Sequence, residues 1–246
     1  MLWGKDPTRP GARSQKSLLQ QQFSVHCGTG FQLRLRWMKE ACPIVENLKV
    51  HSKSLLKDVI EMVKIAVVVG STRPGRRSKQ VADWVLERAA AKGGAEYELL
   101  DVADYKLPLL DEPMPPSMGN YQHEHTKTWA RAVAEFDGYI FVTAEYNHSV
   151  PGALKNALDF LYAEWNNKAA GFVSYGSAGG VRAVENLRLI SGELQMADVR
   201  AQVALPFATE FEGFTTFTPS ATAEENLDVL IEQIVAWSTA LETIRH

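Results

Sequence analysis

Apolar runs alternate with helical patterns along the chain from Met62 onward. Five short runs have strand patterns, and the first, over residues 65–69, is apolar throughout, which is typical of a strand buried on both faces of a sheet. These runs cover residues 64–70, 96–101, 138–143, 168–174 and 200–205. Because helical patterns separate them, we predict an α/β fold with a doubly wound, five-stranded parallel sheet covered by helices on both faces.

The segments between the runs repeat apolar residues every three or four positions, which is the period of a helix with one buried face. The predicted helices cover residues 80–91, 123–136, 152–163, 181–194 and 224–244. Thr222, with Glu225 three residues later, predicts a capping box that opens the last helix.

The first apolar run stops at a short loop, Gly70-Ser-Thr-Arg-Pro-Gly-Arg-Arg-Ser78, and a helical pattern follows at once. The first N–H groups of a helix have no acceptor within the helix and carry a partial positive charge, so they attract anions. The same loop supplies the hydroxyl groups of Ser71, Thr72 and Ser78 and the guanidinium groups of Arg73, Arg76 and Arg77. This charge suits a terminal phosphate better than a carboxylate, and the alternative is an ordinary loop with solvated arginines.

Two known phosphate loops do not fit this segment. Gly70 and Gly75 have the spacing of a Walker loop, but Arg76 and Arg77 stand where that loop has Lys and then Ser or Thr. Thr72 stands where the dinucleotide fingerprint G-x-G-x-x-G has its second glycine. These departures favour a mononucleotide as the ligand.

Ligands of doubly wound sheets bind at the carboxyl ends of the strands, where the strand order reverses. The loop after the third strand contains Tyr146, which offers a flat face beside backbone amides. The loop after the fourth strand, Tyr175-Gly-Ser-Ala-Gly-Gly180, allows close approach to a planar ligand. A phosphate at one loop and a flat ring between two others indicate flavin mononucleotide (FMN). We expect the Pro-rich residues 107–116 to overhang the same edge of the sheet, as a wall of the cleft or a subunit contact.

Three segments carry a family resemblance in their order and spacing. They are residues 70–78, residues 145–159 (Glu-Tyr-Asn-His-Ser-Val-Pro-Gly-Ala-Leu-Lys-Asn-Ala-Leu-Asp) and residues 174–183 (Ser-Tyr-Gly-Ser-Ala-Gly-Gly-Val-Arg-Ala). Together they resemble the NADPH-dependent FMN reductases of flavodoxin-like fold, a family that includes quinone, azo-dye and chromate reductases. The resemblance covers about residues 63–205 and implies the strand order 2-1-3-4-5. One departure is Ala144, where the family usually has Pro.

The resemblance assigns residues to the cofactor. It implies that Ser71, Arg73 and Ser78 hold the FMN phosphate, and the charge of the loop adds Arg76 to them. It also implies that the loop after the third strand lies along the flavin ring and that the loop after the fourth strand borders its other edge. The residues concerned are Glu145, Tyr146, Asn147, His148, Ser174, Tyr175, Gly176, Ser177 and Gly179.

The activity implied by the resemblance is hydride transfer from NADPH or NADH through bound FMN to a small acceptor, such as a quinone, a flavin, an azo compound or chromate. Donor and acceptor would use one cleft in turn, which predicts ping-pong kinetics. Backbone N–H groups from Tyr146 to His148 are candidates to stabilise negative charge on the reduced ring. We expect no dedicated catalytic acid; His148 is a candidate, against the simpler interpretation of a loop histidine that contacts backbone. The alternative function is a flavodoxin-like electron carrier that serves a protein partner.

Charge divides the chain into two parts. Residues 1–61 carry 10 Lys or Arg and 5 Asp or Glu, whereas residues 62–246 carry 16 and 24. A domain with a net charge of −8 lacks the basic surface that binds nucleic acid, and no apolar run is long enough to span a membrane. We therefore expect small-molecule partners, and the resemblance adds a homodimer or homotetramer.

Residues 1–61 show no sustained period and end just before the first predicted strand. We interpret them as a poorly structured N-terminal extension of a domain at 62–246, from either a start codon assigned too early or a processed leader, including one for an organelle. Cys27 and Cys42 both lie in this extension, so the core has no disulfide framework. This distribution suits a reducing compartment, and we expect the cytoplasm.

Overall fold

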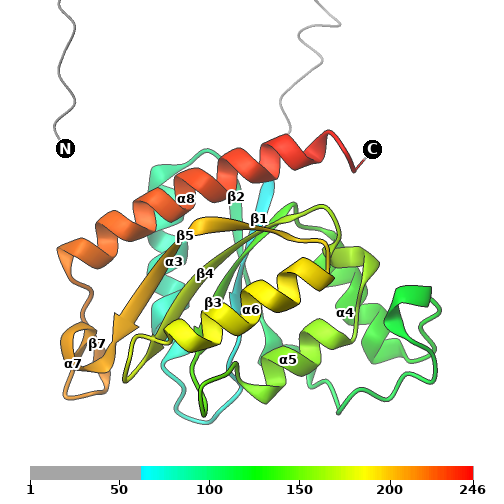
Figure 1. Ribbon diagram of the computed structural model, residues 1–246, viewed down its shortest axis with the longest axis horizontal. Helices are drawn as coiled ribbons and strands as arrows, with labels where there is room; N and C mark the ends of the chain where they lie inside the picture. The colour runs from blue at the N-terminus through cyan, green and yellow to red at the C-terminus, as the bar shows by residue number, and fades with distance from the viewer. Residues whose placement is uncertain (1–61, 246) are drawn as a thin grey trace, which may run out of the picture. The chain divides into compact units, whose positions relative to one another are not determined.

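The five predicted strands form one parallel sheet in the computed structural model, which describes residues 62–245 (Figure 1). Their order is β2-β1-β3-β4-β5, as the resemblance implied. The strands are β1 (Lys64–Val69), β2 (Glu96–Asp101), β3 (Gly138–Ala144), β4 (Ala169–Gly176) and β5 (Ala197–Pro206). The order reverses between β1 and β3, which pair from Ile65 opposite Gly138 to Val69 opposite Val142.

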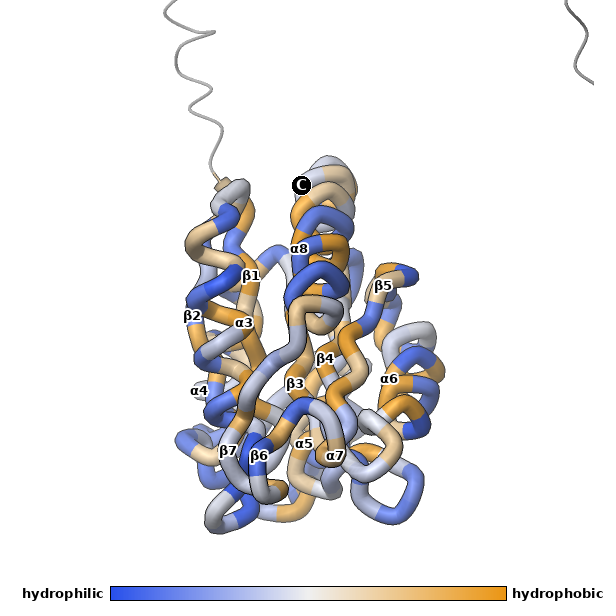
Figure 2. Tube along the Cα trace, turned by 90° about the vertical axis from the view of Figure 1, so that its left-hand side faces the viewer, coloured by the Kyte–Doolittle hydropathy of each residue, from blue (hydrophilic) through white to orange (hydrophobic). Residues whose placement is uncertain are grey.

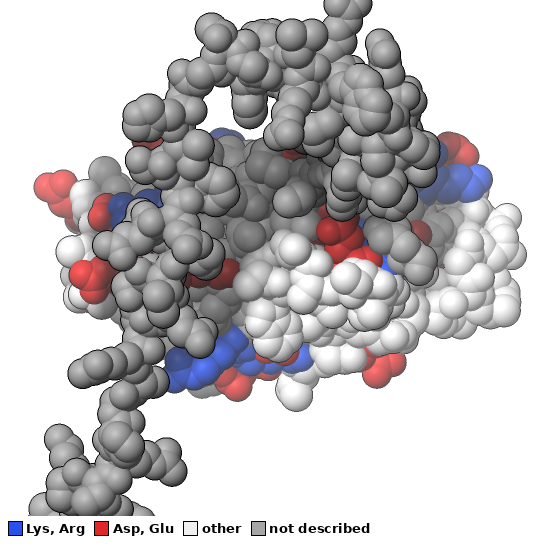
Figure 3. Space-filling view, turned by 90° about the horizontal axis from the view of Figure 1, so that it is seen from above, with Lys and Arg blue, Asp and Glu red and all other residues white. Residues whose placement is uncertain are grey.

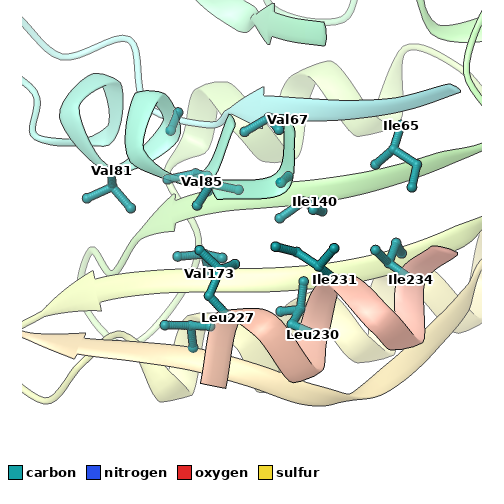
Figure 4. Packing of buried hydrophobic residues seen from close by; sticks show 14 of the residues in the cluster. Ile65, Val67, Val81, Val85, Ile140, Val173, Leu227, Leu230, Ile231 and Ile234 are labelled. Atoms are coloured by element: carbon teal, nitrogen blue, oxygen red, sulfur yellow. The ribbon is translucent and has the colours of Figure 1, made fainter. Parts of the chain in front are cut away.

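Helices cover both faces of the sheet because the central strands are buried on both sides. The main helices are α3 (Ser78–Lys92), α4 (Glu124–Ala134), α5 (Gly152–Asp159), α6 (Val181–Glu193) and α8 (Ala221–Glu242). On one face, α3 and α8 pack against alternate residues of β1, β3 and β4, such as Val67, Ile140 and Val173 (Figure 4). On the other face, α4, α5 and α6 pack against the intervening residues, including Phe141 and Phe172. Figure 2 shows the resulting concentration of hydrophobic residues along the strands.

This arrangement brings the loops after β1, β3 and β4 to the same edge of the sheet, at the lower left of Figure 1. The segment after β5 reaches the same edge. It forms the short helix α7 (Phe207–Glu210) and a hairpin of two strands, β6 (Phe211–Glu212) and β7 (Thr216–Phe217). Neither α7 nor the hairpin was predicted from the sequence.

Two predicted helices differ from the structure at their ends. The helix predicted at 152–163 stops at Asp159; Tyr162 has non-helical angles, φ −137° and ψ −66°, and a short 3₁₀ turn follows at Ala163–Trp165. The predicted capping box of the last helix is wrong. Ser220 is the N-cap instead, and its hydroxyl accepts a hydrogen bond of 3.2 Å from the Ala223 amide.

Basic and acidic side chains lie next to one another on the part of the face that Figure 3 shows uncovered. Among the described residues, Arg88 of α3 pairs with Asp228 and Glu224 of α8. No helix in the described range is long and apolar enough to cross a membrane. The predicted extension at 1–61 lies outside the described residues, as do Cys27 and Cys42.

One buried cation closes the end of α4. The ammonium group of Lys168 donates hydrogen bonds to the carbonyl oxygens of Val133 and Ala134, each at 3.3 Å, and to the hydroxyl oxygen of Tyr139 at 3.0 Å. These carbonyls end the helix, so the lysine satisfies acceptors that have no partner within it. Burial and, to a smaller extent, the charge of Arg245 lower the pKa of Lys168 to about 8.

This pKa predicts how stability depends on pH. Between about pH 8 and pH 10.4 the unfolded chain holds a proton on Lys168 that the folded chain has lost, so the free energy of unfolding rises with pH. From pH 7.5 to pH 9.5 we expect the unmodified chain to gain about 2 kcal/mol relative to Lys168→Met, measured by urea unfolding at both values. Lys127→Met, which removes an exposed lysine of α4, should gain as much free energy of unfolding between these pH values as the unmodified chain does. If Lys168→Met gained as much as the unmodified chain, the lowered pKa of Lys168 would be contradicted.

Candidate functional site

A cavity of about 320 Å³ opens at the edge where the loops after β1, β3 and β4 meet. Residues from all three loops and from the segment after β5 line it. They are Arg73, Pro74, Gly75, Arg76, Arg77, Ala144, Glu145, Tyr146, Tyr175, Gly176, Phe207 and Phe214. The predicted site residues Arg73, Arg76, Glu145, Tyr146, Tyr175 and Gly176 are therefore brought together. The predicted residues that do not line the cavity are Ser71, Ser78, Asn147, His148, Ser174, Ser177 and Gly179.

Ser71 and Ser78 are fully buried behind the tyrosines of this lining. The Ser71 hydroxyl lies 3.0 Å from the Tyr146 hydroxyl. The Ser78 hydroxyl stands in the first turn of α3, buried and without a hydrogen-bond partner in the described part of the chain. Burial raises the pKa of Tyr175, and the nearby Ser78 hydroxyl opposes that rise, but Tyr175 completes no hydrogen bond to Ser78 Oγ. A buried donor without an acceptor is unfavourable, so this position favours a ligand.

The three arginines of the β1 loop differ in how they are used. Arg76 pairs with the buried Asp101 at the end of β2, at 2.5 Å, and donates a hydrogen bond of 2.9 Å to the Ser71 carbonyl oxygen. Its guanidinium therefore holds the loop against β2. Arg73 is exposed, and neither it nor Arg77 forms an ion pair with any described residue. Their charges remain available to an anion in the cavity.

The loop after β3 is a tight two-residue turn. Tyr146 and Ser149 exchange backbone hydrogen bonds of 2.9 and 3.1 Å, while Asn147 and His148 between them have φ values of 50° and 67°. Two consecutive positive φ values are the pattern of a type I′ turn, which residues other than glycine adopt at some cost. The predicted set of free amides from Tyr146 to His148 is thus corrected, because the Tyr146 amide already donates to Ser149. Asn147 and His148 keep amides without an acceptor in the described range.

The carboxylate of Glu145 turns away from the open cavity toward α6. It accepts a 2.6 Å hydrogen bond from Arg182 Nε and a 3.2 Å bond from the Arg182 amide in the first turn of that helix. The Glu145 side chain is only 7% exposed, and the partial positive charge of the helix N-terminus stabilises it there. Glu145 therefore fixes the β3 loop to α6. Its contribution to the cavity wall is steric.

The loop after β4 is held by its own hydrogen bonds. The Ser174 hydroxyl donates to the Gly179 carbonyl oxygen at 2.7 Å, which closes the loop. Gly180 has a φ of 76°, and a Cβ atom there would lie 2.7 Å from Ser174 Cβ. This glycine is thus required by packing inside the loop rather than by a ligand. Gly176 is the glycine of the loop that lines the cavity, while Ser177 is exposed.

His148 is exposed and does not line the cavity. Its backbone carbonyl accepts a 3.3 Å hydrogen bond from the side-chain amide of Asn186 on α6. This contact involves the backbone of His148 and not its imidazole ring, so the role of the ring stays a prediction.

Sequence reasoning missed Phe207 and Phe214, which complete the lining. Phenylalanines at 207, 211, 214 and 217 recur at helical spacing, so periodicity alone indicates a helix here. Gly213, which directly follows Glu212 and precedes Thr215 and Thr216 by two and three residues, was the available signal for a turn.

A second cavity of about 240 Å³ lies on the other side of the β1 loop, between Thr72 and the start of the Pro-rich segment at Leu107. Asn156 of α5 fixes this segment, because its side chain donates to the Pro108 carbonyl oxygen at 2.6 Å and accepts from the Leu110 amide at 3.0 Å. The Pro-rich segment thus forms a wall at the edge where it was expected.

Comparison with known proteins gives consistent matches. The family model described as NADPH-dependent FMN reductase matches residues 63–210. The NAD(P)H-dependent FMN reductase ntnL of Nectria sp. is 38% identical over 175 residues, which cover 67% of this chain and 86% of the relative. A quinone reductase of Pseudomonas putida is 32% identical over 142 residues, covering 52% and 69%.

Among solved structures, the flavoenzyme FerB, an NAD(P)H:(acceptor) oxidoreductase from Paracoccus denitrificans, has the same fold. It superposes with a TM-score of 0.57 at 23% identity over 72% of this chain and 98% of its own. The family match spans every loop that lines the main cavity up to the start of α7. The chain belongs to the NADPH-dependent FMN reductase family.

Proposed function

We propose that the main cavity binds FMN and that the chain uses it to reduce a small acceptor, such as a quinone, with NADPH or NADH. The observation that carries this proposal is the unpartnered Ser78 hydroxyl, buried in the first turn of α3, together with the Arg73 guanidinium, which lines the cavity and has no ion-pair partner among the described residues. A phosphate supplies the acceptors that both groups lack, in a first helical turn that contains no acidic residue. Since Tyr146 now bonds to Ser71, the phosphate takes the place of that tyrosine hydroxyl when it binds.

The other side of the cavity suits the flavin ring. Tyr146 and Gly176 line it, and the amides of Asn147 and His148 keep free N–H groups in the adjoining turn. N–H groups held rigidly by a turn stabilise negative charge without reorganising, which favours the reduced form of the ring. Glu145 and Arg182 keep this turn in place through the contact with α6.

When bound, FMN supplies the chemistry, because its ring takes a hydride from the nicotinamide and delivers it to an acceptor. The protein binds the cofactor, orients the donor and the acceptor, and shields the reacting groups from water. Relatives named quinone reductase support a quinone as the acceptor, and free flavins, azo compounds and chromate stay open. One open cleft serves donor and acceptor in turn, so we expect ping-pong kinetics.

The finer features of the assembly are also proposals. We infer a homodimer or homotetramer, supported by exposed apolar residues of the Pro-rich segment, such as Leu109 and Leu110. We also infer a cytoplasmic location, supported by the position of both cysteines within residues 1–61. Light scattering of the FMN-loaded protein measures the assembly.

The visible spectrum of the full-length protein with FMN tests the proposed function. We expect anaerobic NADPH or NADH to bleach the bound flavin and a quinone to restore its colour. Flavin that binds but stays oxidised with both nucleotides would point to an electron carrier, and absence of binding would reject the proposal.

Replacing Arg73 should weaken phosphate binding. Loss of one charge-assisted contact predicts that Arg73→Ala raises the Kd for FMN about tenfold or more, as followed by quenching of flavin fluorescence. Riboflavin, which has no phosphate, should bind Arg73→Ala and the unmodified chain equally well. Arg131→Ala, an exposed arginine of α4 outside the cavity, is the matched control. Unchanged FMN affinity in Arg73→Ala would remove the phosphate assignment.

Removing the His148 ring should leave catalysis intact, because the ring does not line the cavity. His148→Gly retains the positive φ of the turn, so we expect quinone reduction within about twofold of the unmodified rate from pH 5.5 to 8.5. Steady-state kinetics across this range decide the point. A pH profile that loses one limb in His148→Gly would instead make this histidine a proton donor.

A further inference from the structure

We infer that the β6–β7 hairpin is a further wall of the cofactor site and that Phe214, at its tip, packs against the flavin ring. This inference rests on the proposed function, since it concerns the same cavity. It assigns a role to residues 207–217, a segment that neither the loop motifs nor the charge pattern connects to the cofactor.

Phe214 is an unusual residue for an exposed turn. Its side chain is 67% exposed, yet it lines the cavity together with Arg77 and Tyr146. Its φ is 58° and that of Gly213 is 56°, and the Thr215 amide closes the turn on the Glu212 carbonyl oxygen at 3.1 Å. A phenylalanine held at positive φ is strained, and a strained residue at a cavity indicates a functional constraint.

The other phenylalanines of the segment have aromatic partners, whereas Phe214 has none among the residues that the structure describes. Phe211 contacts Phe217 and Phe207, with ring centroids 5.1 Å apart in both pairs. Phe207 in turn contacts Tyr175 of the cavity wall at 6.0 Å. Phe214 is the one phenylalanine of α7 and the hairpin without an aromatic partner among the described residues. Its free face is available to a planar ligand.

The hairpin is fixed at its strands and at its base. Gln80 of α3 donates to the Thr215 carbonyl oxygen at 3.2 Å and accepts from the Phe217 amide at 3.1 Å. At the base, the buried carboxylate of Glu210 accepts from the Ser220 amide at 2.7 Å and from its hydroxyl at 3.0 Å. Figure 2 shows β6, β7 and α7 together at the loop end of the molecule. The tip is therefore presented by a constrained element rather than by a loose loop.

These contacts give Phe214 a chemistry distinct from that of the β1 loop. Arg73 and Ser78 are proposed to bind a phosphate, whereas an aromatic side chain binds a flat ring through apolar and stacking contacts. Riboflavin shares the ring of FMN and lacks the phosphate. A contact with the ring must therefore affect the binding of both compounds by the same factor.

The test is fluorescence titration of the full-length protein with FMN and with riboflavin. Phe214→Asn removes the ring and keeps a residue that tolerates positive φ, and we expect it to raise both Kd values roughly fivefold. Phe214→Tyr should restore both affinities. Leu189→Ala removes an apolar side chain of α6 that is 78% exposed and outside the cavity, so it is the matched control and should change neither value.

Gln80→Leu tests the positioning of the hairpin. It removes both hydrogen bonds to the hairpin without touching the cavity, and we expect weaker binding of both flavins. Far-UV circular dichroism of each variant confirms that the fold is retained.

The outcomes separate this inference from the proposed function. Unmodified protein that fails to bind FMN rejects the proposed function itself. Binding by the unmodified chain with equal affinities in Phe214→Asn overturns the role of Phe214 alone. A loss confined to FMN, with riboflavin unaffected, would also overturn it, because the contact would then lie at the phosphate end.

Discussion

Burial of β1, β3 and β4 on both faces is the constraint on which the rest of the structure depends. Alternate residues of each strand contact α3 and α8 on one side and α4, α5 and α6 on the other. A shift of one residue would exchange the two sets, so the register is strongly fixed. Since these strands are parallel and adjacent, their carboxyl ends coincide. Three loops that are distant in sequence therefore meet in one cavity.

The polar groups at that cavity are of two kinds. Some are already hydrogen-bonded within the fold, and others have no partner and are free to bind a ligand. Arg76 and Glu145 look like ligand-binding residues in the sequence, but each is held by a partner in the fold, Asp101 and Arg182 respectively. The Ser78 hydroxyl and the amide of Asn147 have no such partner in the described chain. These unsatisfied groups, in an otherwise well-bonded edge, are the ones that we propose for the ligand.

The sequence predicted the parts of the fold that depend on local pattern. All five strands were found because strand patterns such as 138–143 alternate with helical ones, and the β1 loop was singled out because charge and hydroxyls concentrate after a strand. The Arg76 pairing with Asp101 was not predictable, since it joins residues 25 positions apart through the sheet order. The hairpin was missed because its phenylalanines follow helical spacing, while its form depends on the distant Gln80. Ser220 replaced Thr222 as the cap because Glu210, also distant, bonds to Ser220.

Gln80 links two walls of the cavity that lie far apart in the sequence. They are the first turn of α3 and the β6–β7 hairpin. Gln80 lies in the first turn of α3, the helix whose N-terminus borders the proposed phosphate side, and it bonds to the turn and to β7 of the hairpin at Thr215 and Phe217. Any ligand that restricts the motion of this helix turn also restricts the hairpin, so the second wall loses less conformational entropy when it closes on the ligand. The two ends of one ligand therefore reinforce each other, and affinity grows by more than the sum of two independent contacts.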